Sequence, residues 1–232
     1  MLDLIIKNGS CYIDKDLKSS DIAIKNGKII EIGKIKNEAK EIYDAKGLTV
    51  LPGCIDTQTH FREPGSTDTE DLHSGSRAAI VGGITSVFEM PNTNPPTSNK
   101  TEFQRKLDLA KNRMYCNYAF YFGATADNAK DLASLKSLVG CCGIKLFAGS
   151  STGNLLVAAE KDIDKVFQNS SKVVAVHSED EEILNTNKKL IKKGDVHSHP
   201  VWRSVECAMS STRRIVRIAE RYNKKAHILH VT

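Results

Sequence analysis

Short runs in which apolar and polar residues alternate dominate the first 50 positions of the chain. The runs "DLIIKNGSCYI", "DIAIKNGKIIEIG" and "KEIYDAKGLTV" show a period of two, which is typical of half-buried β-strands. Asn-Gly and Lys-Gly pairs interrupt them, and such pairs favour tight turns. The pattern predicts a small β-sandwich module over residues 1–50.

From Leu51 onward the pattern changes to apolar or β-rich runs, most of them separated by longer polar or amphipathic segments. The runs are "LTVLPGCID", "GITSVFEM", "CNYAFYFGA", "CCGIKLFAG", "SKVVAVHSE" and "KAHILHVT". This alternation predicts βαβ units and a parallel sheet. Because the runs are almost continuously apolar, we expect both faces of the sheet to be covered.

Polar side chains gather where most of these runs end. They are Asp56, Gln58, His60, Glu89, Asn92, Lys145, His177 and His230. In a TIM-type (β/α)8 barrel, several strand ends contribute to one site, whereas a doubly wound open sheet, the alternative, concentrates its site at one crevice. Six runs fall short of the eight strands in a barrel of about 250 residues. Residues 51–232 are therefore predicted to form an incomplete barrel, completed by further chain or by another chain.

Composition and charge narrow the functional classes. The net charge of +5 is mild and the basic residues are dispersed, which argues against nucleic-acid binding. No apolar run approaches the roughly 18 residues of a membrane span, and the N-terminus lacks a secretory pattern. The six cysteines are scattered without a C-x-x-C pair, so we expect reduced thiols and a cytoplasmic protein.

Three of the strand-end residues are histidines. His60, His177 and His230 come from three different runs, and neutral imidazoles are common zinc ligands. The alternative for each is a histidine that only satisfies local hydrogen bonds. The convergence of three favours a metal site.

Lys145 lies inside the apolar run "GIKLFAG". A lysine buried there would lose its proton readily, whereas a surface lysine would keep it. A neutral amine can take up carbon dioxide and become an anionic carbamate able to bridge two metal ions. The sequence permits this modification without requiring it.

Five motifs carry a resemblance to a known family. They are "PGCIDTQTHFREPG", "GGITSVFEMPNTNPPT", "GIKLFAGSSTGN", "VVAVHSED" and "AHILHVT". The chain resembles, over its whole length, the N-terminal portion of the dihydroorotases of the cyclic amidohydrolase superfamily. The related hydantoinases and allantoinases share the first-strand pattern and the lysine, but not typically the pairing of REPG with MPNT.

The resemblance implies a metal-dependent hydrolase barrel and the reversible, zinc-dependent hydrolysis of (S)-dihydroorotate to N-carbamoyl-L-aspartate, a step of pyrimidine biosynthesis. It implies one or two zinc ions held by His60, Lys145, His177 and His230, with Lys145 open to N-carboxylation. Substrate would contact His60, Arg62 and Asn92, and an arginine fork suits a carboxylate. Read without the resemblance, Arg62 fits a surface ion pair and Asn92 a turn. The family's general acid/base Asp would lie beyond Thr232, so we expect this chain alone to be inactive.

Gln58 departs from the family pattern Asp-x-His-x-His. A glutamine oxygen is a weaker choice for zinc than imidazole, so the metal nearest the first strand is the doubtful one. This leaves a single-metal enzyme, a hydantoinase or allantoinase, and a non-catalytic dihydroorotase-like scaffold as alternatives. The expected partners are a small-molecule substrate and either a second copy of the chain or another pyrimidine-pathway enzyme.

Overall fold

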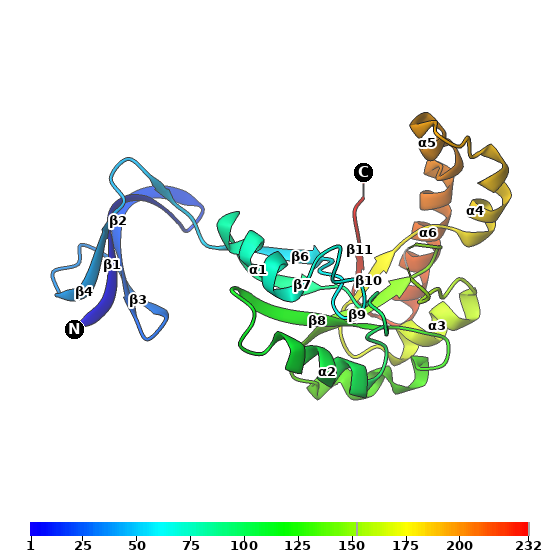
Figure 1. The fold of residues 1–232 in the computed structure, drawn as a ribbon, viewed down its shortest axis with the longest axis horizontal. Helices are drawn as coiled ribbons and strands as arrows, with labels where there is room; N and C mark the ends of the chain where they lie inside the picture. Colours follow the sequence, from blue (N-terminus) through cyan, green and yellow to red (C-terminus); the bar gives the residue numbers. More distant parts are fainter. Residues whose placement is uncertain (152, 232) are drawn as a thin grey trace. The chain divides into compact units, whose positions relative to one another are not determined.

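The computed structural model describes residues 1–151 and 153–231. The chain divides into two compact units, Met1–Gly53 and Cys54–Thr232 (Figure 1). The division falls three residues after the boundary expected from the sequence.

The first unit is a mixed five-stranded sheet. Its strands run in the order β3-β2-β1-β4, and β5 also pairs with β1. The pairs β1–β2 and β2–β3 are antiparallel, whereas β4 and β5 run parallel to β1. The strands are β1 (Leu2–Ile13), β2 (Asp16–Lys25), β3 (Lys28–Gly33), β4 (Ala39–Asp44) and β5 (Thr49–Val50).

The hairpin between β2 and β3 shows why the sequence turns there. Asn26 and Gly27 both take positive φ angles, of 51° and 70°, as the favoured two-residue hairpin turns require. The small core of this unit contains Leu2, Ile5, Ala23 and Ile35. Several large apolar side chains of β3 and β4 are exposed, among them Ile29, Ile32 and Ile42.

The second unit is built on a six-stranded sheet whose strands are all parallel. They follow chain order, β6-β7-β8-β9-β10-β11, so each strand lies beside the next one in the sequence. The strands are β6 (Cys54–Thr59), β7 (Ile84–Glu89), β8 (Asn117–Gly123), β9 (Cys141–Phe147), β10 (Val174–His177) and β11 (Ala226–Ile228). The predicted incomplete barrel is confirmed.

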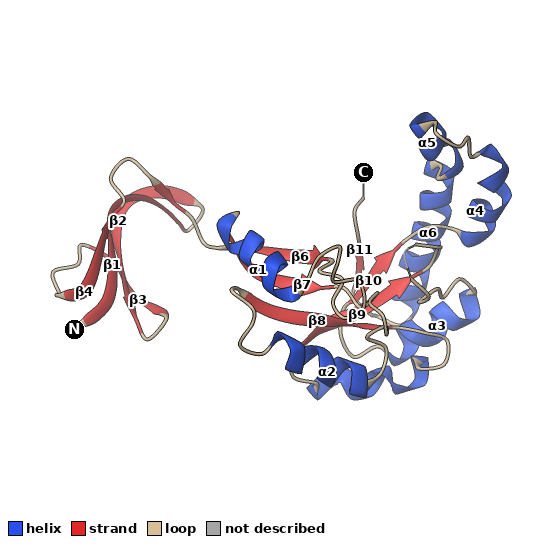
Figure 2. Ribbon diagram, viewed as in Figure 1, coloured by secondary structure: helices blue, strands red, loops and turns tan. Residues whose placement is uncertain are grey.

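Helices follow the strands, as the alternating pattern predicted (Figure 2). Four of the α-helices begin at side-chain caps, with Asp71, Asn99, Asp180 and Ser204 accepting backbone N–H groups of α1, α2, α4 and α6. The helices and 3-10 turns are α1 (Leu72–Val81), α2 (Lys100–Ala110), η1 (Ala129–Ser137), α3 (Glu160–Asn169), α4 (Glu181–Asn187), η2 (Lys188–Leu190), η3 (Val196–Ser198), α5 (His199–Trp202) and α6 (Val205–Arg221).

Alternate residues of the central strands divide between two cores. Ile144 and Leu146 of β9 pack into the large cluster that also contains Phe103 of α2 and Ile163 of α3. Residues of opposite orientation, such as Tyr121 of β8, belong to a separate small cluster. Since side chains alternate across a strand, this second face is the one toward which Lys145 points. The helices thus cover one face, and the other carries the polar strand-end residues.

No helix in residues 1–151 and 153–231 has the length and apolar character needed to cross a membrane.

Candidate active site

The strand ends of the second unit bring the predicted residues to one end of the sheet. Asp56 and Gln58 lie in β6, and His60 directly follows that strand. Lys145 is in β9 and His177 closes β10. In a parallel sheet the carboxyl ends of all strands lie at the same edge, so these side chains share one region. His230, two residues after the end of β11, joins them there.

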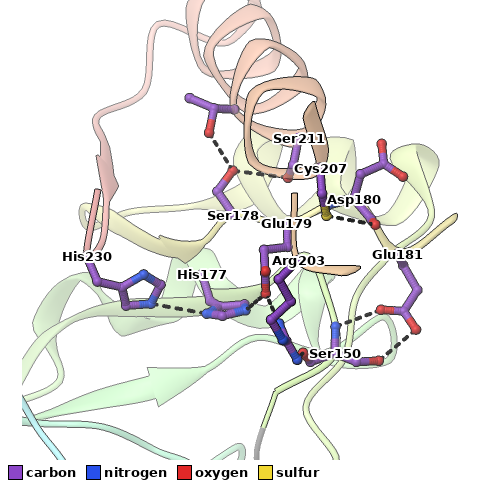
Figure 3. Close-up of polar contacts among 11 residues, drawn as sticks. Ser150, His177, Ser178, Glu179, Asp180, Glu181, Arg203, Cys207, Ser211 and His230 are labelled. Carbon is purple, nitrogen blue, oxygen red and sulfur yellow. Dashed lines mark hydrogen bonds and ion pairs between the residues drawn. The ribbon is translucent and has the colours of Figure 1, made fainter. Parts of the chain in front are cut away.

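His177 and His230 are in direct contact (Figure 3). Nδ1 of His177 lies 3.1 Å from Nε2 of His230. Two imidazole nitrogens bound to one tetrahedral zinc ion, at about 2.0–2.1 Å each, lie roughly 3.3 Å apart. The spacing therefore fits two ligands of one metal ion.

The other ring nitrogen of His177 is held by Glu179. Nε2 of His177 lies 2.6 Å from Oε2 of Glu179. When Nε2–H donates to this carboxylate, Nδ1 keeps a lone pair directed at the position beside His230. Metal-binding histidines commonly donate their second N–H to a carboxylate in this way, which fixes the tautomer and the ring orientation.

Glu179 is held in turn by Arg203, which precedes α6 (Figure 3). Arg203 forms an ion pair with Glu179 and donates through Nη2 to the carbonyl of Ser150 at 3.0 Å. Burial opposes ionisation of the Glu179 carboxyl, but the His177 hydrogen bond and the Arg203 charge hold its pKa below the usual range. The carboxylate therefore stays charged and available to His177. Neither Glu179 nor Arg203 was among the residues expected from the sequence; the position of Glu179 two residues after His177 was the available signal.

Lys145 is almost fully buried, with 1% of its surface exposed. Its ammonium nitrogen lies 4.5 Å from the centre of the Phe147 ring. Burial lowers the pKa of Lys145 to about 7. A large fraction of this side chain is thus a neutral amine near pH 7, as carbamate formation requires.

His60 is a neutral imidazole near pH 7. Burial, together with the charges of Arg62 and Lys145, lowers its pKa to about 4. A hydrogen bond with the side chain of Asn92 opposes this shift. The structure therefore brings His60, Arg62, Asn92 and Lys145 into one electrostatic neighbourhood.

Asp56 and Gln58 are both half-buried. The backbone N–H of Gln58 donates to Oδ1 of Asp56 at 2.9 Å, and the pairing of β6 with β7 is irregular between Asp56 and Thr59. One oxygen of Asp56 is thus engaged by the backbone of its own strand.

A metal would fit the donor set at this end of the sheet. Among residues 1–151 and 153–231, no three His, Cys, Asp or Glu side chains converge as a metal-binding group. His177 and His230 supply two nitrogens at a suitable spacing. Lys145 is not one of those four residue types, but it has the buried amine described above. These residues could hold an ion if Lys145 or a non-protein ligand adds to the two imidazoles.

Comparisons with known proteins identify the family of the chain. The family model "Amidohydrolase family" matches residues 49–230. A dihydroorotase of Methanosarcina mazei is 35% identical over the whole chain, and an allantoinase of Escherichia coli K12 is 33% identical over 99% of it; the matches cover 52% and 53% of those proteins. The chain thus spans about half the length of the curated relatives it matches.

Among solved structures, the L-hydantoinase (dihydropyrimidinase) of Arthrobacter aurescens superposes with a TM-score of 0.92 at 26% identity. That match covers the whole chain and 53% of the hydantoinase. The fold, the strand-end residues and the match over residues 49–230 lead to one conclusion: the chain belongs to the amidohydrolase family, among the cyclic amidohydrolases.

Proposed function

We propose that this chain is part of a zinc-dependent dihydroorotase, which reversibly hydrolyses (S)-dihydroorotate to N-carbamoyl-L-aspartate in pyrimidine biosynthesis. The observation that carries the proposal is the position of Arg62 and Asn92 beside His60, next to the buried Lys145. Dihydroorotate bears a carboxylate beside its cyclic amide, so its enzyme needs a cationic fork close to the hydrolytic centre. The 35% identity to a dihydroorotase supports the same activity.

Each residue has a distinct task in this proposal. A zinc ion, when bound, supplies Lewis-acid chemistry for the ring carbonyl and for water. His177 and His230 present their nitrogens to it, and Glu179 keeps His177 in the tautomer that leaves Nδ1 available. Arg62 holds the substrate carboxylate through parallel hydrogen bonds, which fixes the ring relative to Lys145 and the histidines.

Proton transfer to the departing amide nitrogen is assigned to a group outside this chain. The chain spans about half the length of its relatives, and we expect residues 1–232 alone to open no ring. Gln58 stands where the family has a histidine, so we propose a single firmly held ion at Lys145, His177 and His230.

Arg62→Ala tests the substrate class. The assay uses the zinc-loaded protein produced from its complete reading frame, with dihydroorotate, hydantoin and allantoin as substrates. Ring opening is monitored as a loss of ultraviolet absorbance. We expect kcat/KM for dihydroorotate to fall about 100-fold or more, since a bidentate charge pair is lost. Activity on neutral hydantoin that exceeds activity on dihydroorotate, and that survives Arg62→Ala, would contradict the proposal.

A hydantoinase or allantoinase is the second candidate, favoured by the TM-score of 0.92 and the 33% identity. The scaffold alternative, in which the protein binds a second copy or another pyrimidine enzyme without catalysis, rests on Gln58. Ring opening that His177→Ala abolishes would eliminate the scaffold. A stable complex with such a partner, formed by a protein with neither zinc nor activity, would support it.

A further inference from the structure

A buried ion pair lies beneath the residues assigned to the substrate carboxylate and has no task in the proposed reaction. Glu89, the last residue of β7, and Lys106 of α2 form this pair, and their side chains are 1% and 0% exposed. Charged groups are buried at such depth only when they are paired. An apolar pair of similar volume is often at least as stabilising, so fold stability alone does not explain why charges stand here.

The Glu89 carboxylate reaches the neighbouring strand end. The backbone N–H of Phe61, the residue between His60 and Arg62, favours the charged form of Glu89 against the burial that raises its pKa. The backbone of Arg62 has a φ of 60°, in the left-handed region that costs a non-glycine residue roughly 1–2 kcal/mol. Such a conformation persists only where the surroundings impose it. On the N-terminal side of Arg62, β6 is held by its pairing with β7, in which Thr59 lies opposite Glu89.

The C-terminal side of Arg62 is restrained by a second carboxylate. Glu63 receives two hydrogen bonds from Arg113, at 2.7 and 3.1 Å, and a third from the backbone N–H of Leu72 at 2.9 Å. The residue that directly follows Arg62 is thus firmly anchored.

Lys106 extends the same restraint to Asn92. Its ammonium group donates to the carbonyl of Met90 at 2.9 Å, at the start of the turn that leads to Asn92. The N–H of Met90 donates in turn to the carbonyl of Thr59, also at 2.9 Å. One buried pair therefore ties the segment that carries His60 and Arg62 to the turn that carries Asn92.

We propose that Glu89 and Lys106 are positioning residues that fix the spacing between Arg62 and Asn92 and thereby set the affinity for the substrate carboxylate. This inference rests on the proposed function, in which those two residues hold that carboxylate. Neither member of the pair touches substrate.

The test replaces the pair without leaving an unpaired charge. Glu89→Leu with Lys106→Met keeps the volume but removes both charges and the hydrogen-bond donor to the Met90 carbonyl. Glu89→Gln with Lys106→Met is the conservative counterpart, because the amide keeps the size and polarity of the Glu89 side chain. Binding of N-carbamoyl-L-aspartate is measured by calorimetry in the zinc-loaded protein from its complete reading frame, together with zinc content and thermal unfolding. Leu135→Ala, a buried change in η1, controls for destabilisation alone.

We expect the Leu/Met variant to keep its zinc and bind the ligand about tenfold or more weakly, since small displacements in a preorganised site have large effects. The Gln/Met variant should recover part of the affinity, and Leu135→Ala should bind normally. Unchanged affinity in the Leu/Met variant, or an equal loss in Leu135→Ala, overturns the proposal. If the Leu/Met variant does not fold, the Gln/Met variant decides: a measurable loss supports positioning and wild-type affinity overturns it.

Arg62→Ala, measured in parallel, separates this inference from the proposed function. Weak binding by Arg62→Ala with normal binding by the Leu/Met variant overturns the positioning role and leaves the dihydroorotase proposal standing. Equal binding by wild type and Arg62→Ala overturns both.

Discussion

Replacing Glu179 with glutamine should weaken zinc binding although Glu179 is not itself assigned as a ligand. The change keeps the size of the side chain and removes its charge. In the wild type the carboxylate lies 2.6 Å from Nε2 of His177 and also pairs with Arg203. Glutamine can still accept the hydrogen bond from His177, but it no longer makes the ring more basic and no longer balances the Arg203 charge.

The magnitude follows from the burial of the three groups. His177, Glu179 and Arg203 are 13%, 15% and 21% exposed, so solvent screens their interactions only in part. Loss of such an orienting partner typically costs 10–100-fold in metal affinity. That range corresponds to about 1.4–2.8 kcal/mol of binding free energy.

The assay is competition for zinc against a chromophoric chelator. Glu181→Gln is the matched control, because it removes one charge two residues away. Glu181 accepts from the N–H and the hydroxyl of Ser150, at 2.7 and 2.6 Å, and makes no contact with His177 in the described chain. Wild-type affinity in Glu179→Gln, or an equal loss in Glu181→Gln, would refute the assigned role of Glu179.

Three further predictions concern other residues. Burial lowers the folded-state pKa of Lys145 to about 7, whereas the unfolded value is about 10.4. Between these two pH values the unfolded chain therefore binds more protons than the folded chain. The free energy of unfolding should rise with pH in this range by up to about 1.4 kcal/mol per pH unit. Chemical denaturation in CO2-free buffer should show that this rise is absent in Lys145→Met, and an unchanged slope would contradict the burial argument. Gln58→His should increase bound zinc per chain, as measured by elemental analysis, because imidazole is the better zinc ligand; equal zinc content in both proteins would count against a weak first site. Phe103→Ala should lower the free energy of unfolding by about 3–5 kcal/mol, since Phe103 is fully buried between α2 and the sheet, and a loss below about 1 kcal/mol would show that the core collapses around the cavity.

The sequence predicted the parallel sheet of an incomplete barrel and the end of the sheet at which the polar residues lie. Both follow from local rules, since βα alternation dictates a parallel sheet and strand ends then share one edge. His177 and His230, 53 positions apart, meet for this reason alone. The burial of Lys145 could likewise be predicted from the sequence, because apolar residues surround it in its own strand.

The side chains that other elements contribute as hydrogen-bond and ion-pair partners could not be predicted in the same way. Arg203 lies 24 residues beyond Glu179, in a segment whose composition resembles any polar loop. Lys106 lies in the amphipathic segment "NKTEFQRKLDLAKNRM", where one lysine looks like the others. A signal was nevertheless present, because Phe103, Lys106 and Ala110 form the buried stripe of α2 at helical spacing.

The two buried lysines show why periodicity identifies depth but not chemistry. Burial lowers the pKa of both Lys106 and Lys145, but Glu89 opposes the shift at Lys106. Among the residues that the structure describes, no carboxylate pairs with Lys145, and burial is the cause of its shift. Lys106 therefore acts through its partner, whereas Lys145 has the free amine that can react with carbon dioxide. The difference depends on a glutamate 17 residues before Lys106, and only the folded chain brings the two together.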